Sequence, residues 1–247
     1  MTTNKQSLSL LGIFSLLMVF LQSCNLDLGE RGNGNMITQH VETGDFREIK
    51  LQGNFEVLLR QSDEPSLNIT TDENLMDYIK AETKGGVLEI RSTKKLRPSN
   101  NSKVTVNYRT IEGIEIQGAA SVHTDNKLSG DFLRVSMSGA GNVEMDVDLG
   151  KLELDISGAG AVELSGTADE QDISMSGAGG YDAGDLISRI CRISISGVGG
   201  AEVFVTDDLE ANVSGIGGVS YSGNPENVKS DISGLGSVSE ENGEDPM

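Results

Sequence analysis

Serine is the nucleophilic residue that this sequence repeats with the greatest regularity. Six serines begin a Ser-Gly-x-Gly tetrapeptide, and successive serines are 19, 19, 20, 18 and 19 residues apart. The serines and glycines of these tetrapeptides are Ser138, Gly139, Gly141, Ser157, Gly158, Gly160, Ser176, Gly177, Gly179, Ser196, Gly197, Gly199, Ser214, Gly215, Gly217, Ser233, Gly234 and Gly236. A catalytic serine needs a nearby base, and no Ser-His-Asp set is evident around the two histidines, His40 and His123. We therefore expect the tetrapeptides to be structural, with each serine hydroxyl able to donate to the next.

Metal binding is the other chemistry that glycine-rich turns and abundant carboxylates could support. The turns resemble those of calcium-binding β-rolls, but the inward Asp of that repeat is missing after Gly199-Gly200 and after Gly217-Gly218. Asp146-Val147-Asp148 and Asp207-Asp208 stay open as weak calcium sites. No ligand spacing surrounds either histidine, one of which we place in a tether and the other in a loop. We expect no metal centre, no cofactor and no catalytic residue.

The negative charge of the chain is concentrated in its repeated half. From residue 111 to the end, 25 acidic residues stand against 6 basic ones, whereas residues 24–110 carry 13 acidic and 12 basic residues. An acidic surface repels phosphate backbones, which excludes nucleic acid as a partner. The scarcity of basic residues also argues against a glycan-cleaving groove, because such grooves combine carboxylates with Arg or Lys.

One repeat, residues 151–166, shows which elements position the tetrapeptide. Leu152, Leu154 and Ile156 alternate with acidic residues, and the alternation resumes beyond the glycines. Period-two alternation predicts strands with one buried and one solvent-facing side. The two glycines share the inward parity, so they either relieve crowding or supply a positive φ. No helix fits the connector at 167–170, so strands one period apart must pair in parallel and form a β-helix.

Residues 41–110 lack this period and are predicted to be an irregular β-rich cap that begins the stack and covers its first edge. A strand broken at Gly53, a short helix and a hairpin at Gly85-Gly86 are expected within the cap. The solenoid then occupies residues 111–239, and an acidic tail follows at 240–247.

The first residues carry the features of a secretory signal. A basic residue precedes an apolar run at 8–21 that is too short for a permanent membrane span. The ending Leu21-Gln22-Ser23-Cys24 resembles the bacterial lipobox, which implies removal of a signal peptide of residues 1–23 and lipidation of Cys24, hence attachment to the membrane. The alternative is an ordinary secreted protein in which this cysteine is incidental. Residues 24–40, rich in Gly and Asn, are predicted to be a flexible tether.

The second cysteine of the chain is predicted to be structural. Cys191 lies in phase with the apolar positions of the segment Cys191-Arg192-Ile193-Ser194-Ile195. We interpret it as a small buried hydrophobic residue, without a nucleophilic role and without a disulfide partner in the mature chain.

Several ordered segments support a family resemblance. They are Gly44-Asp45-Phe46, Ile49-Lys50-Leu51-Gln52-Gly53, Phe55-Glu56-Val57, Asp72-Glu73-Asn74-Leu75, Gly86-Val87-Leu88-Glu89-Ile90 and the six tetrapeptides. In this combination the chain resembles the head GIN domain family of putative autotransporter adhesins, frequent in lipoproteins of Bacteroidetes-type bacteria. The resemblance covers residues 41–239 and implies a right-handed parallel β-helix with an adhesive role at the cell envelope.

Two classes of function follow from these observations. The one that we expect is a non-catalytic lipoprotein of the outer membrane that binds a protein or glycan as an adhesin. The alternative is a periplasm-facing structural or envelope-stress accessory lipoprotein without an external ligand. In either case the variable outward positions of the strands are better candidates for binding than the tetrapeptides. Neither the membrane face nor the oligomeric state follows from the sequence.

Overall fold

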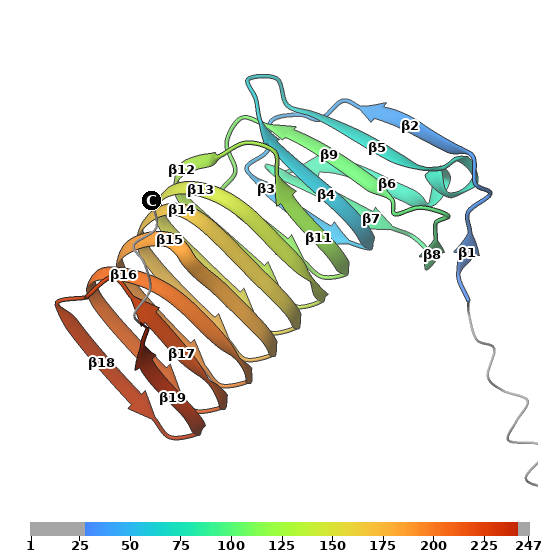
Figure 1. Cartoon of the computed structure of the whole chain (residues 1–247). Coiled ribbons are helices and arrows are strands. Elements are labelled where there is room, and N and C mark those ends of the chain that lie inside the picture. The colour runs from blue at the N-terminus through green and yellow to red at the C-terminus, as the bar shows by residue number, and fades with distance from the viewer. Residues whose placement is uncertain (1–27, 242–247) are drawn as a thin grey trace, which may run out of the picture.

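The computed structural model describes residues 28–241, which form an elongated stack of β-coils with a mixed β cap at its N-terminal end (Figure 1). The cap contains β1 Glu30–Arg31, β2 Met36–Val41, β5 Ser66–Asp72, η1 Glu73–Tyr78, β6 Ile79–Lys84, β7 Val87–Ser92, β8 Leu96–Arg97 and β9 Lys103–Tyr108. The coils contain β3 Glu48–Gln52, β4 Asn54–Gln61, β10 Gly113–Ile116, β11 Ala119–Thr124, β12 Leu128–Met137, β13 Ala140–Ile156, β14 Ala159–Met175, β15 Ala178–Ile195, β16 Val198–Val213, β17 Ile216–Ser222, β18 Asn227–Ile232 and β19 Leu235–Glu240. The all-β solenoid predicted from the repeat is confirmed.

Successive coils pair in parallel with the register that the repeat predicts. Ala140 lies beside Ala159 and Ala159 beside Ala178, an offset of one period. Because side chains alternate along each strand, every second residue enters the interior and stacks on its counterpart one coil away. Leu154 and Ile173 are one such buried pair. The core is therefore a set of apolar rows that run along the solenoid axis.

Each coil consists of two arms joined by a corner that is shorter than the sequence suggested. In β14 the buried positions are even-numbered up to Ala168 and odd-numbered from Gln171. Thr167 and Ala168 pair with the preceding coil, so they belong to the first arm rather than to a connector. The change of parity at Asp169 and Glu170 is therefore the corner. Because the backbone pairs on both sides of it, the coil remains one strand that bends.

The two departures from a 19-residue spacing have local structural causes. One extra residue enters β15 between its pairings with Glu163 and Gly166 of β14, which gives the spacing of 20. Residues 184–186 of β15 then have no counterpart in β16, and β16 gains one residue between Val205 and Asp208, so the next spacing is 18. Changes of length are thus accommodated in the first arm and at the corner, while the turn keeps its register.

The cap covers the first coil with one pair of parallel strands, which antiparallel strands cover in turn. The strands β3 and β4, separated at Gly53 as predicted, form this first coil and pair in parallel with β7 and β9. The outer edges of those two strands are covered by β6 and β5, and β2 pairs with β5. The expected short helix is the 3₁₀ helix η1, and the expected hairpin joins β6 to β7.

The predicted tether at 24–40 is wrong for the part of it that the structure describes. β1 pairs with β8, and β2 runs along the whole of β5. Asp72 holds this segment, because it accepts hydrogen bonds from the backbone N–H of Gly34 at 2.6 Å and from Ser99 Oγ at 2.7 Å. His40 and His123 consequently lie in strands β2 and β11, and not in a tether and a loop. The predicted signal peptide, Cys24 and residues 242–247 lie outside the described range.

Two further expectations concern membranes and thiols. Within residues 28–241, the chain contains no helix with the length and apolar character needed to span a bilayer.

Cys191 is fully buried, as predicted, and burial raises the pKa of its thiol to about 12. A thiol with so high a pKa is protonated at neutral pH and is not a nucleophile.

Candidate functional site

The six Ser-Gly-x-Gly tetrapeptides lie in register along one edge of the solenoid. Pairing joins the second glycine of each tetrapeptide to that of the next, from Gly141 to Gly236. In each coil the N–H groups of the serine and of the first glycine share one carbonyl of the coil before. Those of Ser157 and Gly158 donate to the carbonyl of Met137 at 2.9 and 3.0 Å. The tetrapeptide is therefore the turn through which the chain enters each new coil.

Both glycines are required because neighbouring coils approach closely at this edge. A Cβ at Gly158 would lie 1.8 Å from the carbonyl oxygen of Gly139, and one at Gly160 would lie 1.8 Å from that of Gly141. These oxygens belong to hydrogen-bonded backbone and cannot move aside as a flexible side chain would. Of the two reasons predicted for the glycines, crowding applies at both positions, and the crowding atoms are backbone. A positive φ is an additional reason at Gly217, where φ is 150°.

The serine hydroxyls do not bond to one another. All six serines are exposed. Within the part of the chain that the structure describes, the hydrogen bond formed by one of these hydroxyls joins Ser157 Oγ to the carbonyl of Met137 at 3.5 Å. The predicted serine-to-serine ladder is therefore wrong. The serines have the outward parity, so their hydroxyls face solvent while backbone N–H groups link the coils.

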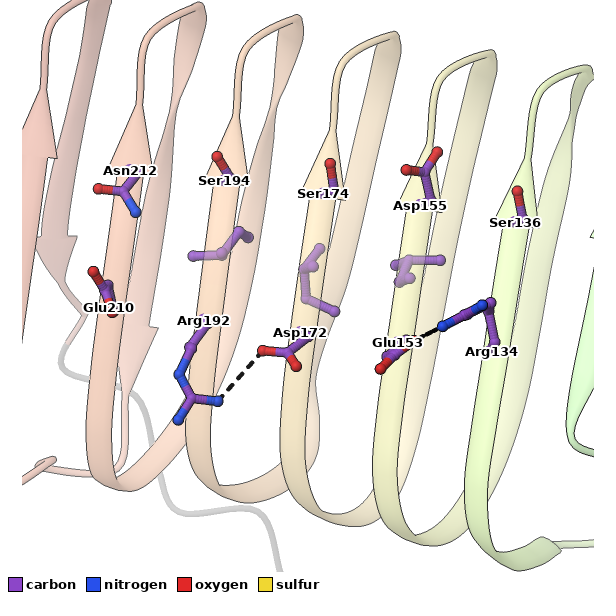
Figure 2. Close-up of a pocket in the computed structure, with 13 residues that line it drawn as sticks. Arg134, Ser136, Glu153, Asp155, Asp172, Ser174, Arg192, Ser194, Glu210 and Asn212 are labelled. Atoms are coloured by element: carbon purple, nitrogen blue, oxygen red, sulfur yellow. Dashed lines mark hydrogen bonds and ion pairs between the residues drawn. The ribbon is translucent and has the colours of Figure 1, made fainter.

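A shallow groove of ≈ 770 Å³ crosses the strands that lead into the turns (Figure 2). Two rows of outward side chains cross it, with one residue from each coil in each row. The row nearer the turns, here called the polar row, is Ser136, Asp155, Ser174, Ser194 and Asn212. The second row, the charged row, is Arg134, Glu153, Asp172, Arg192 and Glu210. Members of a row are about 4.8 Å apart, the spacing of paired strands, and the two rows together form the polar face.

Ion pairs within the chain engage the charged row. Arg134 Nε donates to Glu153 Oε2 at 2.9 Å, Lys151 Nζ lies 2.6 Å from Asp172 Oδ2, and Arg192 donates to the same Asp172 at 3.4 Å. The hydrogen bond from Arg134 lowers the pKa of Glu153. Burial alone would raise the pKa of Asp172, but the hydrogen bond and the charge of Lys151 lower it below its ordinary value. The row therefore stays ionised and internally paired at neutral pH.

The polar row keeps most of its hydrogen-bonding capacity unused. Within residues 28–241, the side chains of Ser136, Asp155, Ser174 and Ser194 form no hydrogen bond or ion pair with another residue. Asn212 interacts with the neighbouring Glu210. Figure 2 shows these side chains in one line, pointing away from the sheet. The polar row is therefore a regular set of donors and acceptors available to a ligand.

The other arm of the coils carries a different surface. One row of its outward acidic side chains is Glu144, Glu163, Asp182 and Glu202. Glu144 lies 3.2 Å from His123, but the other three have no basic partner within residues 28–241. Burial raises the pKa of Glu202, and the negative charges of Asp182, Glu241 and Asp185 raise it further. This arm repels anions and uses little of its charge in internal pairs.

The carboxylates considered as weak calcium sites are engaged by the chain itself. Asp146 lies 3.4 Å from Lys127 Nζ, and Asp148 accepts from Thr167 Oγ1 at 2.8 Å. The pair Asp207-Asp208 likewise bonds to side chains of the adjacent coils. Within the described range, no three His, Cys, Asp or Glu residues are grouped so that they could hold a metal ion.

Sequence reasoning pointed to the outward positions as a class but did not identify the two rows. A simple signal was present in the repeat. The polar row stands two residues before each tetrapeptide serine, and the charged row stands four residues before it. Ser174 and Asp172, for example, precede Ser176 by these intervals. Aligning the repeats on their serines would therefore have assembled the whole polar face.

The fold and this face define a β-solenoid scaffold with regular rows of outward side chains. The family described as putative auto-transporter adhesin, head GIN domain, matches residues 45–225, and the chain belongs to this family. No curated protein matches the chain.

Solved structures share the fold along nearly the whole described chain. A putative adhesin from Bacteroides fragilis has a TM-score of 0.83 and 27% identity, covering 86% of this chain and 100% of its own. A protein from Parabacteroides distasonis described as a putative lipid binding protein has a TM-score of 0.70 and 26% identity, covering 86% and 99%. A putative adhesin from the same organism has a TM-score of 0.66 and 27% identity, covering 85% and 99%.

Proposed function

We propose that this protein is a non-catalytic adhesin of the cell envelope, anchored by a lipid at Cys24, whose polar face binds its partner. The observation that carries the proposal is the polar row, because its side chains repeat at a fixed spacing and four of the five are not used within the described chain. Membership of an adhesin family and the likeness to structures described as adhesins support it. The lipobox resemblance of residues 21–24 supports the anchor.

The chemistry of the polar row favours a chain-like partner. Hydroxyl, carboxylate and amide groups at about 4.8 Å intervals match a partner with hydrogen-bonding groups along its length, such as an extended polypeptide or a glycan chain. The groove has no aromatic residue on which a sugar ring could stack. Tyr181, one of the tyrosines of the solenoid, is buried and bonds to Gln171. Recognition on this face therefore relies on hydrogen bonds.

Substitutions in the polar row test the binding face. Ser174→Arg combined with Ser194→Arg fills the line with long cationic side chains, and we expect it to abolish retention on an array of glycans and matrix proteins. Asn142→Arg is the matched control, because Asn142 is exposed on the other arm. Equal retention of the parent, the double variant and the control would contradict binding through the polar face.

Surface exposure and anchoring are tested in the cell. We expect Cys24→Ser to move the protein from the membrane fraction to the soluble fraction, since the acyl chains provide the attachment. Protease treatment of intact cells should degrade the parent protein. Full protection of the parent, with degradation after lysis, would contradict a surface adhesin and favour the periplasm-facing structural role.

A further inference from the structure

The C-terminal end of the solenoid is an open sheet edge (Figure 1). β18 pairs with β16 and β19 pairs with β17, and within residues 28–241 neither strand has a second neighbour. Each strand therefore presents backbone N–H and C=O groups on its outer side. Such an edge is a template for pairing with another strand.

The apolar rows of the core also reach solvent at this end. Val228 stacks on Leu209 and Ile232 stacks on Val213. The two inner residues are buried, whereas Val228 and Ile232 are each 44% exposed. Of the eight large aliphatic side chains that are exposed in the described chain, five lie from Val198 onward. An apolar surface concentrated at one end of a soluble molecule marks an interaction site.

We propose that the last coil docks against the last coil of a second copy of this chain, with β18 paired antiparallel to its counterpart. Pairing about Ser230 places Lys229 opposite Asp231 of the other copy, and Asp231 opposite its Lys229. The same register places Val228 opposite Ile232 of the other copy. Residues 228 and 232 continue the buried rows, while 229 and 231 have the outward parity. The strand is thus self-complementary in charge on its outer face and in hydrophobicity on its inner face.

The two ends of the molecule differ in shape, so we expect two C-terminal ends to pair with each other about a two-fold axis, and not a C-terminal end with a cap. Pairing of identical ends uses the same surface on both copies and closes as a dimer. The N-terminal end presents β2 and β6, which are antiparallel strands of the cap and do not repeat the outline of a coil. Within its own chain Lys229 Nζ lies 2.7 Å from Glu210 Oε1, so in the dimer its ammonium lies between this carboxylate and Asp231 of the other copy. Since both copies are acidic, we attribute the affinity to backbone pairing and apolar contact, and the register to the Lys229–Asp231 pairs.

The geometry has a consequence for adhesion that rests on the proposed function. Antiparallel docking at the C-terminal ends places the two caps at opposite extremes of the dimer. If Cys24 anchors each chain at its cap end, the dimer joins molecules on two facing membranes. Dimerisation of the purified protein tests the pairing, and clumping of cells tests adhesion. A dimer without clumping would support the pairing and contradict homophilic adhesion.

Disulfide cross-linking tests the register of the pairing. In the full chain carrying Cys24→Ser, the added substitution Ser230→Cys places two cysteines on the two-fold axis, where opposite Cβ atoms are about 5 Å apart. We expect oxidation to produce a covalent dimer, because Cys191 is buried and contributes no background. Ser194→Cys, exposed on an inner coil, is the control and should remain monomeric. Equal cross-linking of the two variants would overturn the proposal.

A charge exchange tests whether the partner is a second copy. By sedimentation velocity we expect Lys229→Asp alone and Asp231→Lys alone to weaken the dimer at least tenfold, and the double exchange to restore it. Ile232→Lys should leave a monomer with unchanged β-sheet circular dichroism. Monomeric parent protein at every concentration, or a double exchange that fails to restore dimerisation, would overturn the proposal. If the protein is monomeric and a strand of another protein pairs with β18, that protein is the occupant of the edge instead.

Discussion

The two ends of the solenoid differ in whether other strands cover their edges. At the N-terminal end, β5 and β6 pair antiparallel with β9 and β7. Asp72 holds the segment that leads into β2, the strand that covers β5. At the C-terminal end, β18 and β19 repeat the shape of the inner coils and have no covering strand in the described chain. The inner coils between them are held on both sides. The stability of a coil should therefore depend on its position, even though the sequence of the turn is repeated.

The largest expected effect compares a glycine of an inner coil with its counterpart in the last coil. Gly158→Val introduces a Cβ that meets the Gly139 carbonyl at 1.8 Å, and we expect the free energy of unfolding to fall by about 3 kcal/mol or more. Gly234→Val creates a similar clash, at 2.1 Å from the Gly215 carbonyl. Its cost should stay below about 1 kcal/mol, because the last coil can separate locally.

Urea denaturation monitored by circular dichroism measures both glycine variants. Equal losses of stability at Gly158 and Gly234 would show that the last coil is held as firmly as the inner ones. Such a result would remove the contrast between an inner coil and an open end.

The next largest loss of stability should come from removing the Asp72 hydrogen bonds that hold the cap together. Asp72→Asn keeps the shape of the side chain but turns an N–H toward the donors of Gly34 and Ser99, so we expect a loss of about 2 kcal/mol. Asp77→Asn, at an exposed position of η1, is the control. Burial alone would raise the pKa of Asp72, but the hydrogen bonds from Ser99 and Gly34 lower it. Proteolysis of the N-terminal strands measures the loosening.

The same group gives the cap a pH dependence with a definite sign. Because the folded pKa of Asp72 lies below its unfolded value, its contribution is fully present above the unfolded pKa and is lost as the pH falls through the folded pKa. The stability difference between the parent and Asp72→Asn should therefore shrink on acidification from about pH 7 to pH 2. A difference that stays constant over this interval would show that the carboxylate charge is not what holds the strand.

A pair of tyrosines compares the interior of the inner coils with that of the cap. Tyr181→Phe removes the buried hydrogen bond to Gln171 Oε1 and should cost about 1 to 2 kcal/mol. Tyr108→Phe should change stability by less than about 0.5 kcal/mol, because the Tyr108 hydroxyl is buried without a partner. Both values follow from urea titrations. A larger loss at Tyr108 than at Tyr181 would contradict the assigned hydrogen bonds.

The smallest effect should come from the ion pairs of the polar face. Lys151→Met removes a cation that lies near Glu153 and Asp172, yet the side chains are partly exposed. We expect a small loss of stability that disappears at high ionic strength. Lys80→Met, on an exposed lysine of the cap, should have no such salt dependence. A salt-independent loss at Lys151 would indicate that its aliphatic stem, and not its charge, stabilises the face.

The solenoid was predictable because its steric requirement repeats in the sequence. A Cβ cannot be placed at either glycine of the tetrapeptide, so both recur in six successive coils and reveal the period. Strand β2 gave no such signal. Most of its side chains are exposed, so apolar and polar residues do not alternate, and its partner β5 lies thirty residues away in the sequence. Its membership of the sheet depends on Asp72, which no local pattern connects to Gly34.

The candidate site was predictable only in part, for a related reason. Outward positions such as Ser174 and Ser194 vary between coils because solvent imposes no single residue type there. Their alignment emerges only when the coils are stacked. The serine hydroxyls of the turns were predicted to face one another, but parity at the turn directs them to solvent.

The parallel pairing of successive coils also determines how the molecule responds to force. A load applied between the cap and the last coil runs along the solenoid axis, and therefore along the hydrogen bonds between coils rather than across them. Those bonds open one after another instead of shearing together. Each coil of about 19 residues releases roughly 65 Å of extended chain when it opens, so single-molecule stretching should show a series of steps of this size. A solenoid built in this way lengthens under tension, beginning at the open end, as its outer coils yield one by one.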